Sequence, residues 1–73
     1  MQNLGKITAA FPDLKSFLAS PQVDALAALP KLQAEDVRLW QLPTYNSENL
    51  HQMGIKMGAA DRIVMGASKY SAE

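Results

Sequence analysis

The chain has 73 residues, 48% of them hydrophobic, and its seven basic and seven acidic residues cancel to a net charge of zero. This length predicts one small domain. Without cysteine, and with His51 as the only histidine, the sequence excludes disulfides and lacks the usual ligands of a structural zinc. The neutral balance argues against nucleic acid as the main ligand, because phosphate binding depends on concentrated positive charge.

Neither targeting nor membrane insertion is indicated by the sequence. The apolar runs are far shorter than the ~20 residues that cross a bilayer, and the first residues lack the pattern of a secretory signal. We expect an intracellular protein, cytoplasmic or nuclear. We also expect an N-terminal extension at residues 1–10, a folded domain at 11–70 and a tail at 71–73. No segment alternates apolar and polar residues long enough for a strand, so the predicted class is all-α.

Five short helices are predicted between the prolines and glycines. The first begins near Pro12, since proline suits an early helical position. The second has Ser20 as its cap and Pro21 as its first residue, and Pro30 ends it. The apolar residues expected to face inward from these two helices are Leu14, Phe17, Leu18, Val23, Leu26, Ala27 and Leu29.

A third helix is expected over residues 34–40, with Glu35 and Asp36 in its first turn, where the helix dipole favours carboxylates. Val37 and Trp40 are expected to pack inward, with Leu39 as a further candidate. The alternative for Trp40 is an interface anchor. Ser47 is expected to cap a fourth helix that runs from Glu48 to Met53, again with an acid at its start.

The most informative segment is the hinge that leads into the fifth helix, residues 58–70. Gly54 and Gly58 are each expected at a helix boundary that needs a positive φ or a close backbone approach, with Ile55 buried between them. Gly66, inside the helix, indicates either close packing or fraying. The residues expected on the inner face of the fifth helix are Ala60, Ile63, Val64, Ala67 and Tyr70.

This C-terminal half resembles a sterile alpha motif (SAM) domain, a bundle of five helices. The residues that carry the resemblance are Leu39-Trp40 and Leu42 in the third helix, Leu50 before the hinge, Met53-Gly54-Ile55 in the hinge, and Gly58 at the start of the last helix. The run 53–64 is most similar to SAM domains of polyhomeotic-type chromatin proteins. The chain departs from the family at residues 24–29, which are alanine-rich where an aromatic pair is common, and at Glu35-Asp36, which replace an acid–glycine pair.

The resemblance implies protein–protein association, with itself or with another SAM domain, as in scaffolds of signalling or transcription regulation. In the family, the end-helix surface of one copy meets the mid-loop surface of the next, head to tail. The expected end-helix residues are Lys56, Met57, Asp61 and Arg62. The expected mid-loop residues are Glu35, Asp36 and Glu48. On this basis Arg62→Glu is expected to abolish self-association and leave the fold intact, and Asp36→Lys is the partner change that restores it.

Other functions find less support. No catalytic activity is predicted, since no nucleophile motif surrounds any serine and His51 is the only candidate base. No cofactor, metal or small-molecule substrate is expected. Nucleic-acid binding stays as the alternative, through the hinge or through Lys56, Arg62 and Lys69, although the hinge lacks the close glycine pair of a helix-hairpin-helix. A purely structural part of a larger protein is the third possibility.

Overall fold

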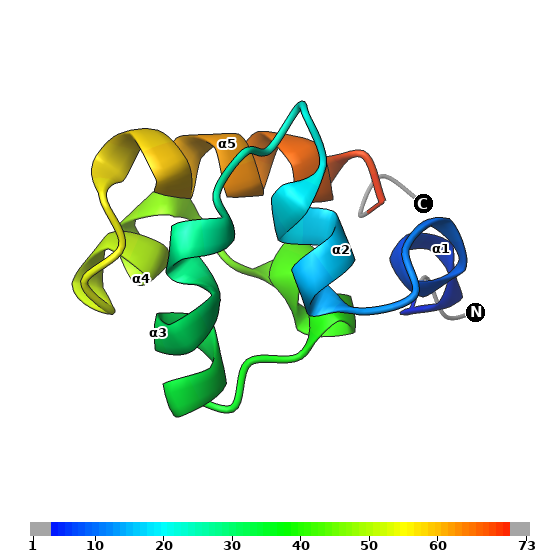
Figure 1. The fold of residues 1–73 in the computed structure, drawn as a ribbon, viewed down its shortest axis with the longest axis horizontal. Helices are drawn as coiled ribbons and strands as arrows, with labels where there is room; N and C mark the ends of the chain where they lie inside the picture. The colour runs from blue at the N-terminus through cyan, green and yellow to red at the C-terminus, as the bar shows by residue number, and fades with distance from the viewer. Residues whose placement is uncertain (1–3, 71–73) are drawn as a thin grey trace.

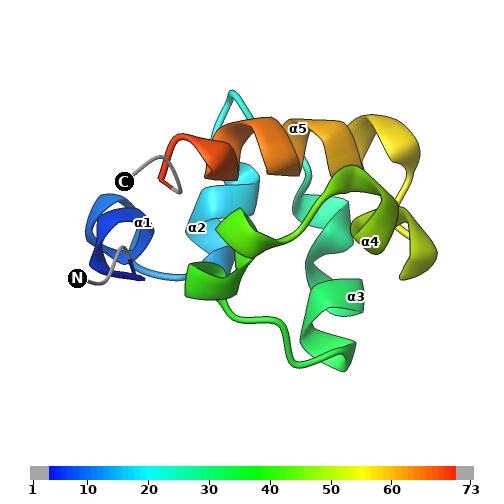
Figure 2. The same ribbon diagram turned by 180° about the vertical axis from the view of Figure 1, so that it is seen from behind.

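The computed structural model describes residues 4–70, and every regular element in that range is helical. The elements in chain order are α1 (Leu4–Ala10), α2 (Leu14–Ala19), the 3₁₀ helix η1 (Leu26–Ala28), α3 (Leu29–Ala34), the 3₁₀ helix η2 (Leu39–Thr44), α4 (Ser47–Gln52) and α5 (Met57–Ser68). The all-α prediction is therefore confirmed. The longest helix, α5, crosses one side of α2, α3 and α4, while η2 lies behind α2 in Figure 1 and in front of it in Figure 2.

One hydrophobic core joins these elements. Its largest fully buried side chains are Ile7, Phe17, Leu18, Val23, Leu32, Leu42, Leu50 and Ile63. Among residues 7–70 no charged or polar residue is buried, so removal of apolar surface from water is the main stabilising term. Over residues 4–70, no helix combines the length and the apolar character that a membrane crossing demands.

The helix α1 was not predicted, because residues 1–10 were expected to be an extension. Its Ile7 is fully buried, and the helix packs against η2. Phe11 follows it and places its ring edge-on to Phe17, at 5.1 Å between ring centroids, and to Tyr70, at 6.3 Å. The packed domain therefore extends toward the N-terminus at least as far as Ile7. The expected tail, residues 71–73, lies outside the described residues.

The second helix was predicted in the wrong place. After α2 the chain makes a turn in which Asp24 adopts φ 44°, and helical structure resumes only at η1 and continues into α3. Pro30 lies in the first turn of α3, where its missing N–H leaves no hydrogen bond unmade. The proline therefore begins a helix and does not end one. Leu26, which was expected to face inward, is 43% exposed.

The third helix was also predicted wrongly. Glu35 caps the C-terminal end of α3, and Asp36 follows with φ 55°, so these acids close a helix where they were expected to open one. The next element is η2, which has three residues per turn. That period places Leu39 and Leu42 on one buried face and turns Trp40 outward, where it is 43% exposed.

The fourth helix and the hinge follow the prediction more closely. Asn46, and not Ser47, caps α4, because its side-chain oxygen accepts a 2.8 Å hydrogen bond from the backbone N–H of Asn49. Gly54 has φ 94° and Ile55 is buried, as expected. Gly58, in contrast, is the second residue of α5 and has no positive φ. The hinge therefore contains one conformationally demanding glycine.

The helix α5 presents the expected apolar face to the core. Its buried residues are Ala60, Ile63 and Ala67, and Val64 and Tyr70 pack against the same core. Gly66 is a site of close packing, because a Cβ atom there would lie 2.9 Å from Cγ2 of Val23 and 3.4 Å from the ring of Phe17. The fraying alternative for this glycine is therefore not needed.

Candidate functional site

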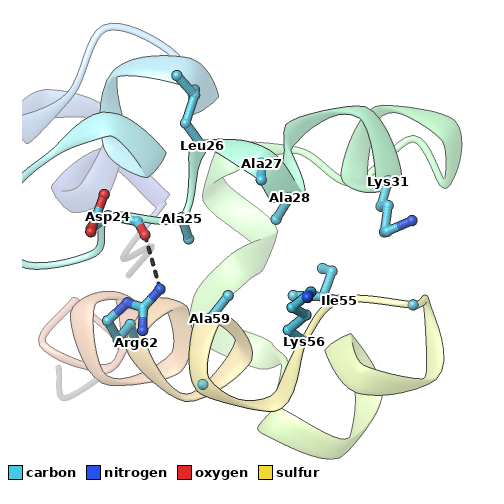
Figure 3. A pocket seen from close by; sticks show the side chains of 12 residues that line it. Asp24, Ala25, Leu26, Ala27, Ala28, Lys31, Ile55, Lys56, Ala59 and Arg62 are labelled. Carbon is cyan, nitrogen blue, oxygen red and sulfur yellow. Dashed lines mark hydrogen bonds between the residues drawn. The ribbon is translucent and has the colours of Figure 1, made fainter.

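An open groove of about 560 Å³ lies between η1 and the start of α3 on one side and the hinge and α5 on the other. Figure 3 shows Ala27 and Ala28 of η1 opposite Ala59 of α5 across this space. The apolar lining residues are Ala25, Leu26, Ala27, Ala28, Ile55 and Ala59. Because most of these side chains are small, the groove stays open between two packed elements.

Three cations line the same groove, namely Lys31, Lys56 and Arg62, against one carboxylate, that of Asp24. The chain as a whole is neutral, so the groove concentrates positive charge. The N-terminal end of α5 adds to it, because a helix start is electropositive and no side chain caps this one. We call this feature, with its apolar lining, the cationic groove.

Arg62 is tied to its own chain. Its Nε donates a 2.7 Å hydrogen bond to the carbonyl oxygen of Val23, and its Nη2 donates one of 2.9 Å to that of Asp24, drawn as the dashed line in Figure 3. Both carbonyls belong to the turn in which Asp24 has a positive φ. Arg62 thus fastens this turn to α5. A glutamate there would face two carbonyl oxygens, so Arg62→Glu is expected to destabilise the fold, contrary to the expectation from sequence.

The other expected end-helix residues lie at the surface around the start of α5. Lys56 and Asp61 are exposed, and Met57 is 47% exposed. Lys56 lines the groove and its side chain makes no capping hydrogen bond, so it is the freest of the predicted cations to meet a partner.

The expected mid-loop acids occupy two separate elements. Glu35 and Asp36 lie at the C-terminal end of α3, the end away from the groove, while Glu48 lies in the first turn of α4. All three are exposed. Asp36 forms an ion pair with Arg38, 3.2 Å between Oδ1 and Nε, and both side chains are so exposed that water and salt leave this pair weak.

Trp40 shares a second hollow, of about 410 Å³, with Asp36. Asp13, Asp36 and Arg38 line the hollow with it, and we call these four residues the Trp40 surface. A hydrogen bond from the backbone N–H of Ser16 holds the pKa of the Asp13 carboxyl below its usual value, so this charge persists at neutral pH. From the sequence, Trp40 was expected to pack inward, with an interface anchor as the alternative. The signal that could have found its exposure is the spacing of Leu39 and Leu42, which fits a three-residue turn.

His51 is explained by the fold. Its Nδ1 donates a 3.0 Å hydrogen bond to the carbonyl oxygen of Ile55, which links α4 to the residue after the hinge glycine. Within residues 4–70, no three histidine, aspartate or glutamate side chains gather in a way that could hold a metal ion.

Compared with protein-family models, curated proteins and solved structures, the chain matches none of them. Function therefore has to be inferred from the two surfaces described above.

Proposed function

We propose that this chain is a SAM-like interaction domain that associates head to tail, with itself or with a related domain. The order of its helices supports the proposal, since four short helical segments after α1 precede a long last helix: α2, η1 with α3, η2 and α4. The kink at Gly54, just before that last helix, supports it too. On this reading α1 is an addition at the N-terminal side of a five-helix bundle.

The observation that carries the proposal is the separation of opposite charges on a neutral chain. The cationic groove lies at the beginning of α3, and Glu35 and Asp36 lie at its end. The groove and these acids share no residue, so one copy can offer both at once. A contact between two different patches is heterologous, and complementary charge speeds the encounter and sets its register.

The direct test is size-exclusion chromatography with light scattering across protein and salt concentration. We expect the mean mass to rise with protein concentration and to fall with salt, because exposed charges are screened. Lys56→Glu should strongly weaken the association. The fold should tolerate this change, because Lys56 is exposed, its side chain forms no cap, and an acid is favoured at a helix start.

Two further variants sharpen the test. Lys69→Glu makes the same change of charge at the far end of α5 and should leave association unaltered. Glu35→Lys should restore association when mixed with Lys56→Glu, since the charges then meet in reversed order. Glu35 suits this better than Asp36, whose positive φ favours aspartate. A wild-type domain that stays monomeric throughout would exclude self-association and leave only association with a related domain. Equal effects of the two lysine changes would contradict the contact through the cationic groove.

Nucleic-acid binding is a second candidate, because three cations line one groove. Its apolar lining offers little to phosphates, and Arg62 already donates to two carbonyls of its own chain. Three phosphate contacts predict a slope of about −2 to −3 for log affinity against log salt. Fluorescence polarisation with an RNA hairpin and a DNA duplex measures that slope.

A further inference from the structure

We propose that Trp40 of one copy inserts into the cationic groove of the next, so that a single indole anchors the contact between copies. The inference rests on the proposed self-association and names what enters the groove. It depends on three features: an unpaired aromatic knob, a groove lined by small side chains, and charges of opposite sign around the two.

The knob is the only tryptophan in the chain. It is 43% exposed, because η2 buries Leu39 and Leu42 and leaves Trp40 on the outer face. A large aromatic side chain that is half in water loses much apolar area when a partner covers it. Tryptophan at the centre of an interface is for this reason often the residue that contributes most to binding.

The groove has the matching character. Alanines make up most of its apolar lining, and a volume of about 560 Å³ gives room for a bulky side chain. Leu26, 43% exposed, lines it, and Met57, 47% exposed, stands between Lys56 and Gly58, which also line it. One contact would thus cover Leu26 and Trp40, two of the four large hydrophobic residues that are exposed among residues 7–70, and would involve the sequence neighbours of a third, Met57. The fourth, Met65, lies further along α5.

The charges set the register of this contact. Asp13, Asp36 and Arg38 line the hollow beside Trp40, so two carboxylates and one guanidinium leave it net negative, whereas Lys31 and Lys56 line the groove. Insertion of the indole would bring carboxylates toward ammonium groups. It would also bring the face of the ring near cations, which attract aromatic rings. The apolar lining and this complementarity favour a second copy of the chain over a polyphosphate as the occupant.

Tryptophan fluorescence tests the insertion directly, because Trp40 is the only indole. We expect its emission to move to shorter wavelength as wild-type protein is concentrated. Trp40→Ala and Ala27→Glu, which fills the groove from an exposed position, should each weaken self-association at least about tenfold. The matched controls are Met65→Ala, another exposed apolar side chain, and Ala19→Glu, another exposed alanine; both should associate as the wild type does.

A mixing experiment separates the two sides of the contact. Trp40→Ala keeps an intact groove, and Ala27→Glu keeps an intact Trp40. Each should be monomeric alone, and an equimolar mixture should form a 1:1 dimer that grows no further. The emission of that dimer should be shifted, because its one indole is buried. If Trp40→Ala fails to fold by circular dichroism, the emission and mass of Ala27→Glu decide the question.

The outcomes distinguish this inference from the proposed function. Wild-type association that Lys56→Glu weakens, while Trp40→Ala and Ala27→Glu leave it unchanged, would overturn the inference and keep the proposed function. Association without any emission shift would overturn it as well. A wild-type chain that is monomeric at every concentration would overturn the inference and self-association together.

Discussion

The two hinge glycines should respond in opposite directions to alanine. Gly54 has φ 94°, a region that costs an L-residue about 1–2 kcal/mol, although the space for a Cβ is adequate, with Cδ of Lys31 at 3.4 Å. Gly58 has no positive φ, lies in α5, and would place a Cβ 3.6 Å from Nη1 of Arg62. Alanine there should stabilise the helix by up to about 1 kcal/mol. The two variants should therefore differ in unfolding free energy by roughly 2 kcal/mol.

Thermal and urea unfolding followed by circular dichroism measure this difference. For a domain of this size it corresponds to roughly 8–16 °C between the two midpoint temperatures. Gly54→Asn should lose less stability than Gly54→Ala, because asparagine tolerates the left-handed region better. The urea slopes should stay equal if only native-state strain changes. Equal destabilisation by both alanines would refute this reasoning and would restore the hinge with two demanding glycines that the sequence predicted.

Three further substitutions test the packing at Gly66, the cap at Asp13 and the hydrogen bonds of Arg62, and the unfolding of each variant is compared with that of the wild type. Gly66→Ala should cost about 1–3 kcal/mol, because the new methyl group meets Val23 at 2.9 Å, and adding Val23→Ala should recover part of the loss. The folded pKa of Asp13 lies below its ordinary 3.8, so its contribution is present above that pH and is lost as the pH falls through the folded pKa. Asp13→Asn keeps an oxygen for the N–H of Ser16 but has no carboxyl to titrate. Its free energy of unfolding should therefore fall less than that of the wild type as the pH is lowered. Arg62→Gln should lower the free energy of unfolding by roughly 1 kcal/mol, because two carbonyl oxygens lose their donor. A loss near zero would show that Arg62 does not stabilise the turn at Asp24.

The sequence predicted the part of the fold whose signals are local. The presence of α4 (though not its cap at Asn46), the positive φ at Gly54 and the buried Ile55 depend on nearest neighbours and on the conformational freedom of glycine. The face of α5 follows from a regular helical period sustained over twelve residues. Where the periodic segment is long and the turn needs a particular residue, the sequence pattern is compatible with one structure.

Elsewhere the same residues allow two structures, and tertiary packing chooses between them. Pro30 is compatible both with the end of one helix and with the first turn of the next. It lies in the first turn of α3, because the chain turns between the buried residues Val23 and Ala28. In α1, a glycine and two β-branched residues give weak helix propensity, and burial of Ile7 outweighs it. Propensity could not show that burial.

The candidate site was only partly predictable for the same reason. Its charges could be named from the chain, since Lys56, Glu35 and Asp36 stand out next to helix boundaries. Its shape could not, because the groove depends on Lys31, distant in sequence from the hinge, and on Arg62, which holds the turn at Asp24. Trp40 was missed because a period of 3.6 was assumed where the chain adopts a period of three.

The placement of the two surfaces bears on the size of the assembly. The cationic groove and the Trp40 surface lie at opposite ends of α3 and share no residue, so filling the groove of one copy leaves its own Trp40 free. Growth then continues unless the rotation between copies closes a ring, and the mass should rise without a plateau. A reciprocal pair, with each Trp40 in the other's groove, would instead stop at twice the monomer mass. Such a plateau would keep the indole as the anchor but would exclude head-to-tail growth.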